Sequence, residues 1–392
     1  MAEDAQSNKA GSLIDKVWYL PNLRRAWRLV KANHGTYGVD RQSLEAFEAH
    51  LGEELHGLQA ALKADAYVPL PGRRVYIPKP DGRKRGLAIP AVRDRVVQQA
   101  LRLRLEPHFE ARFAETSYGF RPGRSAHQAI GDVMASLHQG GEWIVEVDIE
   151  RFFETASHAQ LLAAVAEVVA DGRILRLVQA FLEAGVMEEG RTRTLVAGTP
   201  QGGVISPLLS NAFLNAFDHQ MLGAGHRAVR YADDLVIVCR TREEAEAALA
   251  WVYQVLEGQM GLRLHPQKTR IVHITEGFEF LGFRIWRDAQ GLHLQPRARA
   301  VQRVKEKIRY LTRRQQPKRV DQIVAALNLV IVGWGRYFRM GELRRIGKRL
   351  DRWILRRLWA FLAKRWRSRT WRRYPQTFFY HRLGLRSLQS MA

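Results

Sequence analysis

The segment Ala228–Cys239, AVRYADDLVIVC, decides the fold. Two apolar runs flank the acidic pair Asp233–Asp234, which predicts two short strands joined by a turn that carries both carboxylates. An isolated Asp-Asp pair is most often only a β-turn, so its surroundings matter. Upstream, Trp143–Phe153, WIVEVDIERFF, predicts another strand, whose end carries Asp148. The sequence therefore places three carboxylates at the ends or turns of apolar strands.

Three carboxylates in such positions need a cation. Crowded carboxylates raise one another's pKa unless a positive charge is bound, and Mg²⁺ prefers carboxylate, phosphate and water oxygens. Two such ions, roughly 3.5–4 Å apart, can activate a 3′-hydroxyl and stabilise a leaving pyrophosphate. Asp148, Asp233 and Asp234 are therefore candidate catalytic residues and metal ligands. The cofactor expected is a pair of Mg²⁺ ions, with Mn²⁺ as a substitute.

The surrounding sequence predicts interleaved helices and strands. A basic hairpin is expected around Pro-Asp-Gly in Arg73–Pro90, and strands recur within 263–286. Helices are expected within Leu13–Leu62, over Val92–Phe113, after a Ser125 N-cap, from the PQGGVISP loop (200–207) to about Leu222, over Thr241–Gly258 and in the C-terminal region. No glycine-rich dinucleotide fingerprint is present, so this order predicts an α+β fold with an antiparallel sheet.

The composition points to a polyanionic partner. The chain has 392 residues and a formal charge of +23, from 62 Lys+Arg and 39 Asp+Glu. It is 46% hydrophobic, a globular composition that suits two or three domains. No apolar run approaches the roughly 20 residues that a membrane span needs, so a cytoplasmic location without membrane contact is expected. The single cysteine, Cys239, excludes an intramolecular disulfide and a cysteine-based zinc site.

Most of the positive charge lies near the C-terminus. Between Arg297 and Arg373 there are 25 Lys+Arg and 4 Asp+Glu, a local excess of +21. Half of the ten tryptophans lie in the same region: Trp334, Trp353, Trp359, Trp366 and Trp371. A surface that grips phosphates and packs against bases would have this composition. The alternative is a helical core with solvated basic faces.

Several blocks in the chain resemble one family in order. Tyr231–Asp234 looks like the YxDD box of reverse transcriptases, and Asp148 matches their first palm acid. GTPQGGVISPLLSNAFLNAFD (198–218) is similar to a block typical of group II intron reverse transcriptases. Further blocks of that family resemble 75–101 and 118–130 in the fingers, 278–285 in the primer grip and 333–341 in the thumb or maturase region.

The resemblance implies a right-hand polymerase: fingers, a palm with an antiparallel sheet, and an α-helical thumb. The expected division is 1–72 for an N-terminal extension and the start of the fingers, 73–140 for the fingers, 141–290 for the palm and 291–392 for a basic helical thumb or maturase-like region. No H-N-H or cysteine-bearing zinc pattern follows, so an appended endonuclease is not expected.

The resemblance also assigns roles to single residues. Lys79 and Arg85 would contact the incoming triphosphate, with surface solvation as the alternative. Gln201 would lie beside the nucleotide, and Phe152 under its sugar, although Phe153 could be the matching residue and core packing is the alternative. The primer and template side is expected to include Tyr231, Gly282, Arg121 and Arg124.

Two functional hypotheses follow from the resemblance. The first is an RNA-directed DNA polymerase that takes an RNA template, a DNA primer and dNTPs. The second is an RNA-binding maturase of a group II intron RNA, with polymerisation secondary or lost; the intact acids favour the first. A group II-like enzyme without an intron, serving host defence or DNA repair, is a third reading that the sequence does not separate from the others.

Overall fold

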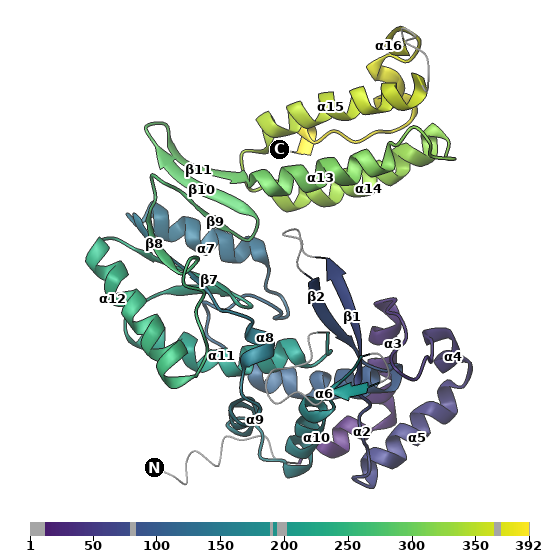
Figure 1. The fold of residues 1–392 in the computed structure, drawn as a ribbon, viewed down its shortest axis with the longest axis vertical. Helices are drawn as coiled ribbons and strands as arrows, with labels where there is room; N and C mark the ends of the chain where they lie inside the picture. Colours follow the sequence, from purple (N-terminus) through teal and green to yellow (C-terminus); the bar gives the residue numbers. More distant parts are fainter. Residues whose placement is uncertain (1–11, 79–83, 189–190, 194–201, 364–369, 392) are drawn as a thin grey trace. The chain divides into compact units, whose positions relative to one another are not determined.

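The structure is a computed structural model that describes residues 12–78, 84–188, 191–193, 202–363 and 370–391 (Figure 1). The chain folds as two compact units. The first comprises Met1–Ala129, Val147–Ile237 and Glu243–Arg270, and the second comprises Ile130–Glu146, Val238–Arg242 and Ile271–Ala392. Helices and mostly antiparallel strands interleave along the chain, as the sequence predicts.

The N-terminal segment is helical, which confirms the prediction for Leu13–Leu62. The long helix α6 (Val92–Glu110) packs against α3 (Leu20–Ala32). Between them, Asn22 Nδ2 donates a hydrogen bond of 3.2 Å to the Ala100 carbonyl. Trp27 stacks on Phe47 with ring centroids 4.8 Å apart. The helices are α2 (Ile14–Trp18), α3 (Leu20–Ala32), α4 (Leu44–Ala49), α5 (Leu51–Lys63) and α6 (Val92–Glu110).

The two strands of the predicted basic hairpin are confirmed, and its Pro-Asp-Gly turn lies outside the described residues. Strands β1 (Gly72–Pro78) and β2 (Lys84–Ile89) pair antiparallel, with Tyr76 opposite Gly86. Two short strands that the sequence analysis did not predict, β4 (Val186–Glu188) and β5 (Arg191–Arg193), extend this sheet in the order β2-β1-β4-β5. The contact between β1 and β4 is parallel, so this sheet is mixed.

A second four-stranded sheet has the order β6-β7-β3-β8. Its strands are β3 (Trp143–Asp148), β6 (Ala228–Tyr231), β7 (Asp234–Cys239) and β8 (Arg270–His273). The strand predicted over Trp143–Phe153 is confirmed as far as Asp148, its last residue, and its continuation to Phe153 is wrong. Arg151 has a φ of +50°, and a left-handed residue cannot continue a pleated strand. The chain instead enters the single-turn helix α8 (Phe152–Thr155).

Along the chain, helices precede and follow β3, precede β6 and follow β7. Helix α11 is the one predicted after the PQGGVISP loop, and α12 with a π-helical extension is the one predicted over Thr241–Gly258. The helices are α7 (Ala126–His138), α9 (His158–Ala166), α10 (Gly172–Glu183), α11 (Ser206–Gly223), α12 (Arg242–Val252) and the π-helix η1 (Tyr253–Gln259). Ser125 caps α7 as predicted, because its Oγ accepts a 3.3 Å hydrogen bond from the Gln128 amide.

The C-terminal part of the chain is a helical bundle that follows a three-stranded sheet. Strands β9 (Phe278–Phe280), β10 (Phe283–Asp288) and β11 (Gly291–Pro296) are antiparallel. The bundle comprises α13 (Ala298–Leu311), α14 (Val320–Phe338), α15 (Leu343–Ala363) and the short α16 (Thr370–Arg373), η2 (Phe378–Arg382) and η3 (Gln389–Met391). Asp351 accepts hydrogen bonds from the Leu388 and Gln389 amides and from the Ser387 hydroxyl, and so anchors the last segment to α15. None of the described helices is long and apolar enough to cross a membrane.

His293 joins the β10–β11 hairpin to the residue that precedes α15. His293 Nε2 lies 2.9 Å from Asp288 Oδ1, and His293 Nδ1 lies 2.5 Å from Glu342 Oε1. Hydrogen bonds to Asp288 and then to Glu342 raise the pKa of His293. The doubly bonded imidazolium therefore stabilises the folded state.

We expect this stabilisation to depend on pH. Because the folded-state pKa of His293 lies above its ordinary value near 6.5, the contribution is complete below that value and is lost as the pH rises through the folded-state pKa. Thermal unfolding of the wild type and of His293→Gln, followed from about pH 5 to about pH 9, should therefore converge at high pH. A constant difference in Tm across that range would contradict the expectation.

Candidate functional site

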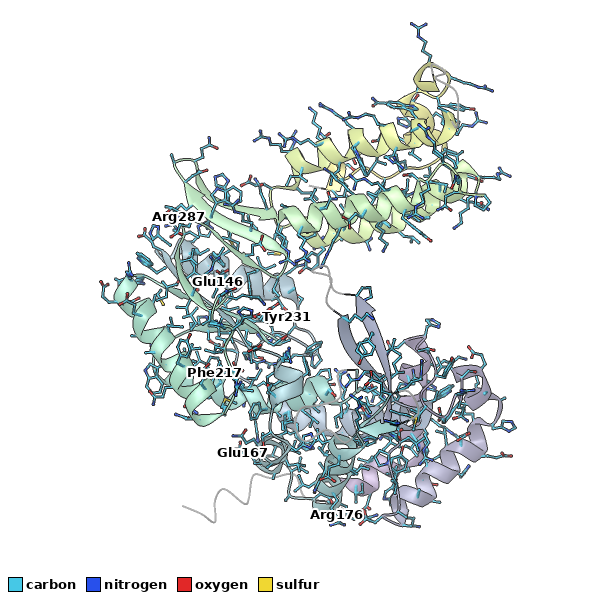
Figure 2. The ribbon with its side chains drawn as sticks, viewed as in Figure 1. Glu146, Glu167, Arg176, Phe217, Tyr231 and Arg287 are labelled. Atoms are coloured by element: carbon cyan, nitrogen blue, oxygen red, sulfur yellow. The ribbon has the colours of Figure 1, made fainter. Side chains whose placement is uncertain are left out.

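The acidic pair lies at a two-residue hairpin turn, with Asp233 in the turn and Asp234 at the start of β7. Tyr231 pairs with Asp234 across β6 and β7, so Ala232 and Asp233 form the turn itself. Tyr231 is labelled in Figure 2 at the end of β6. Ala232 has a φ of +60°, a left-handed conformation that costs a non-glycine residue about 1–2 kcal/mol. The turn therefore requires contacts that hold it in this shape.

The sheet brings Asp148 to the same end as this turn. Strand β3 neighbours β7, and the Glu142 amide, just before β3, donates a 2.9 Å hydrogen bond to the carbonyl of Cys239, the last residue of β7. Two neighbouring strands that meet in this way must run antiparallel. Asp148, the last residue of β3, therefore lies at the sheet end where Asp234 begins β7.

A lysine lies against the carboxylate of Asp148. Lys268 Nζ is 2.7 Å from Asp148 Oδ2. The preceding turn holds the end of β3, because the His265 amide donates a 2.8 Å hydrogen bond to the Asp148 carbonyl. Among the described residues, no three or more His, Cys, Asp or Glu side chains are arranged to hold a metal ion. The side chain of Asp148 has an ammonium partner in this structure.

The loop after α6 packs directly on the acidic turn. The Tyr118 amide donates to the Arg230 carbonyl at 2.8 Å, and the Arg230 amide donates to the Thr116 carbonyl at 2.9 Å. At Gly119 a Cβ would lie 2.2 Å from the Ala232 nitrogen. Only glycine fits there, since any side chain would displace the backbone of the turn.

Two arginines of this loop have partners inside the protein. The Arg121 guanidinium is buried; it pairs with Glu110 at 2.8 Å and donates to the Ala114 carbonyl at 2.6 Å. Arg124 is half-buried, donates to the Glu115 carbonyl and lies over the ring of Tyr118. Their predicted contact with primer or template stays a prediction, and the internal partners of Arg121 give it a second, structural role.

The structure describes the other predicted residues to different extents. Phe152 is 3% exposed and packs against Phe153 and Phe213, so its role under the nucleotide sugar stays a prediction. Gly282 lies in the β9–β10 turn with a φ of +85°. Arg85 lies in β2 opposite Ile77, with only its backbone described. Lys79 and Gln201 lie outside the described residues.

The glycine that follows Gln201 lies against the β1–β2 hairpin. Gly202 has a φ of +123°, and a Cβ there would lie 2.5 Å from the Ala88 carbonyl oxygen of β2. Gln98 of α6 then accepts hydrogen bonds from the Val204 and Ile205 amides at 2.7 and 3.2 Å. These contacts position the start of α11 against α6 and β2.

The basic C-terminal region presents one continuous charged face. Six side chains of α15 recur at helical spacing, all exposed: Arg344, Arg345, Lys348, Arg349, Arg352 and Arg356. They span about 18 Å along the helix, and Figure 2 shows nitrogen-tipped side chains projecting along it. We refer to these six residues as the α15 basic stripe. By contrast, Trp334, Trp353 and Trp359 pack against the apolar core of the bundle, which favours the alternative reading for these aromatic residues.

Comparison with known proteins identifies the family. Residues 77–285 match the family described as reverse transcriptase (RNA-dependent DNA polymerase), and residues 301–379 match the group II intron, maturase-specific domain. Protein YkfC of Escherichia coli is 38% identical over 305 residues, which cover 68% of this chain and 80% of YkfC. This chain belongs to the group II intron reverse transcriptase and maturase family. The match also confirms the predicted right-hand polymerase fold.

Two further relatives match smaller shares of their own length. Group II intron-encoded protein LtrA of Lactococcus lactis is 34% identical over 200 residues, which cover 50% of this chain and 33% of LtrA. A chain of a solved structure titled "Partial Cas6-RT-Cas1--Cas2 complex" has a TM-score of 0.41 and 24% sequence identity to this chain. The alignment covers 63% of this chain and 41% of the chain in that structure. This likeness is too distant to add to the assignment.

The sequence analysis missed two features of the region around the acidic turn. Lys268 precedes a short strand and has no distinctive pattern around it. The polar residues of α11 carried a signal, because Asn211, Asn215 and Asp218 recur at helical spacing in a helix that is otherwise mostly apolar. Such a polar face in a buried helix indicates internal partners.

Reverse transcriptases use divalent metal ions, so Lys268 and a metal would compete for Asp148. We expect Lys268→Met to tighten Mn²⁺ binding, measured by electron paramagnetic resonance on the protein without nucleic acid. The Lys268 side chain is 56% exposed, so the effect should be modest, roughly two- to fivefold, as for other exposed pairs. Lys268→Arg keeps the charge and serves as the matched control. Equal affinities in all three proteins would contradict the competition.

Proposed function

We propose that this protein is an RNA-directed DNA polymerase that extends a primer 3′-hydroxyl with dNTPs on an RNA template. The observation that carries the proposal is the position of Asp148, Asp233 and Asp234 at one end of a single sheet. All three lie within the segment that matches the reverse transcriptase family.

The donor set suits Mg²⁺. Three carboxylates are hard oxygen ligands, and Asp148 already holds a cationic group, the Lys268 ammonium. Two Mg²⁺ ions would supply activation of the 3′-hydroxyl and stabilisation of the leaving pyrophosphate. The protein's own residues would fix the carboxylates, because Asp148 ends β3 and the Asp233–Asp234 pair lies in a braced turn.

The remaining site residues belong to the same proposal. Lys79 and Arg85 on the fingers hairpin would neutralise the triphosphate, with Gln201 and Phe152 beside the base and sugar. Tyr231, Gly282, Arg121 and Arg124 would contact primer or template. We also propose the division into an N-terminal extension (1–72), fingers (73–140), palm (141–290) and thumb (291–392).

Primer extension tests the polymerase proposal. We expect the purified protein to extend a DNA primer on an RNA template with dNTPs and Mg²⁺, and Asp233→Ala to be slower by at least roughly a thousandfold. Loss of several kcal/mol of metal-mediated stabilisation, at about 1.4 kcal/mol per decade of rate, implies that scale.

Asp15→Ala is the control, since it removes an exposed carboxylate from α2 and should leave the rate unchanged. Near-wild-type extension by Asp233→Ala, with contaminating polymerases excluded, would remove the catalytic assignment.

A second function, binding of a group II intron RNA, is favoured by the maturase-specific match over residues 301–379. The α15 basic stripe lies within that segment. Structured RNA offers phosphates and 2′-hydroxyls more than readable base edges. The stripe would therefore supply general affinity, and specificity would come from the fold of the RNA. The two functions are compatible in one protein.

Salt dependence tests the stripe. The triple variant Arg345→Gln, Arg349→Gln, Arg352→Gln should bind a structured RNA more weakly. Each phosphate contact releases about 0.7–0.9 counterions on binding, so loss of the three arginines should reduce the magnitude of the slope of log affinity against log salt by about 2. The triple variant with Lys at the same positions keeps the charge and should retain the slope. An unchanged slope in the Gln variant would show that the stripe is only solvated.

A further inference from the structure

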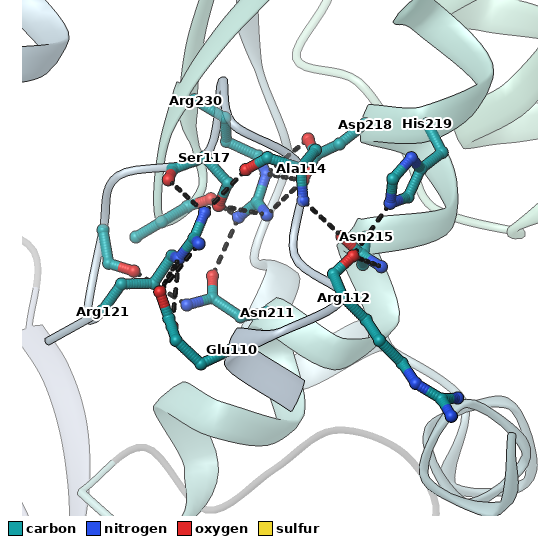
Figure 3. Close-up of polar contacts among 12 residues, drawn as sticks. Glu110, Arg112, Ala114, Ser117, Arg121, Asn211, Asn215, Asp218, His219 and Arg230 are labelled. Carbon is teal, nitrogen blue, oxygen red and sulfur yellow. Dashed lines mark hydrogen bonds and ion pairs between the residues drawn. The ribbon is translucent and has the colours of Figure 1, made fainter. Parts of the chain in front are cut away.

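A fully buried ion pair lies behind the acidic turn. The side chains of Arg230 and Asp218 have no exposed surface. Arg230 Nε is 2.8 Å from Asp218 Oδ1, and Arg230 Nη2 is 2.5 Å from Asp218 Oδ2, a bidentate arrangement (Figure 3). Arg230 lies in β6, immediately before the Tyr231–Asp234 motif, so its side chain belongs to the strand that leads into the acidic turn.

The same guanidinium holds the turn itself. Arg230 Nη1 donates a 2.9 Å hydrogen bond to the carbonyl of Ala232, the residue in the left-handed conformation. Nη1 also donates to Asn211 Oδ1 at 3.0 Å, and Nη2 donates to Ser117 Oγ at 2.8 Å. One planar group thus joins α11, the loop after α6 and the backbone of the acidic turn.

Helix α11 anchors the other side of this arrangement. Its polar face carries Asn211, Asn215, Asp218 and His219. Asn211 Nδ2 donates to the Gly119 carbonyl at 2.7 Å, and Gly119 is the residue packed against Ala232. Asn215 and His219 bond the carbonyl of Arg112 and so hold the beginning of the same loop (Figure 3).

A second buried arginine completes the arrangement. Arg121 Nη1 donates to the Ser117 carbonyl at 2.8 Å, while the Ser117 hydroxyl accepts from Arg230. Ser117 is therefore held by both guanidinium groups, and Glu110 neutralises Arg121 at 2.8 Å. The loop cannot move relative to the turn without breaking charged hydrogen bonds at Ser117.

Fold stability alone does not require this chemistry. A buried ion pair can often be replaced by well-packed apolar residues without loss of stability. An apolar pair, however, has no donor for the Ala232 carbonyl. A lysine is also inadequate, because an ammonium lacks the rigid fork that bonds Asp218, Asn211, Ser117 and Ala232 together.

We propose that Arg230 is a positioning residue for Asp233 and Asp234, acting through the Ala232 carbonyl, with Asp218 as its counter-ion and Arg121 as the support of Ser117. The proposal rests on the polymerase function proposed above. It assigns to Arg121 a supporting role in the site in addition to any contact with nucleic acid.

The test uses two variants of the full-length protein. The first is Arg230→Met with Asp218→Leu, which replaces the ion pair by apolar residues of similar volume. The second is Arg230→Lys, which keeps a cation beside Asp218. Arg102→Met with Glu106→Leu removes the i,i+4 ion pair of α6 and is the matched control. Each protein is compared with the wild type by Tm, kcat and KM for dNTPs, and affinity for a primer–template duplex.

Positioning predicts a particular split. We expect the Met/Leu variant to unfold at a Tm close to that of the wild type, to bind primer–template within about threefold, and to lose roughly a hundredfold in kcat, the scale expected when reacting groups are misplaced by about 1 Å. The kcat of Arg230→Lys should lie between the kcat of the wild type and that of the Met/Leu variant. The control pair should leave kcat unchanged.

Amide hydrogen exchange provides a readout that needs no activity. Exchange in a peptide that covers Arg230–Asp234 should accelerate at least about tenfold in both Arg230 variants, as expected when a local structural unit opens, while exchange in α6 and in the helical bundle stays unchanged. If the wild type does not extend a primer, the polymerase proposal fails, and exchange at the turn still decides the positioning role.

Two outcomes would overturn the proposal. One is a folded Met/Leu variant with wild-type kcat and wild-type exchange at the turn. The other is a loss of kcat that follows the loss of Tm in all variants, the control pair included. If the Met/Leu variant does not fold, Arg230→Lys with unchanged exchange at the turn has the same consequence.

Discussion

The ion pair between Arg230 and Asp218 is the interaction on which the acidic turn depends. A charge buried without a partner would be strongly destabilising, so each group holds the other in place. Once the guanidinium is fixed, its remaining donors fix Ala232 and Ser117. The left-handed Ala232 then sets where the Asp233–Asp234 pair leaves the hairpin. A strained backbone position is thus maintained by buried charge.

The three carboxylates face a different electrostatic constraint. Close carboxylates repel each other unless a cation lies between or beside them. In the structure Lys268 supplies that cation for Asp148. The same carboxylate chemistry suits a divalent ion, so the ammonium and the metal are alternatives at one oxygen. The turn from His265 to Lys268 is bonded to the end of β3, and it therefore keeps the ammonium near the site.

In the C-terminal bundle, the apolar side chains and the basic side chains of α15 lie on different sides of the helices. Its apolar residues form one core, against which Trp334, Trp353 and Trp359 pack, and the α15 basic stripe lies on the exposed side of α15. Asp351 is not part of this outer face, because it is used internally to anchor the last segment. The α15 basic stripe therefore carries a single sign of charge, which supports the proposed contact with phosphates.

The sequence by itself determined the fold class, the order of the elements and the family, because hydrophobic periodicity and the ordered blocks around Tyr231–Asp234 are local patterns. It also located Asp148, Asp233 and Asp234 at strand ends. It did not show that the strand at Trp143 stops before Phe153, since that depends on one left-handed residue, Arg151. The pairing of Arg230 with Asp218, the burial of Arg121 and the contact of Lys268 with Asp148 were decided only by the tertiary structure. The local sequence around a charged residue does not show whether its side chain is solvated or buried. Its partner depends on how segments that are distant in the sequence pack together.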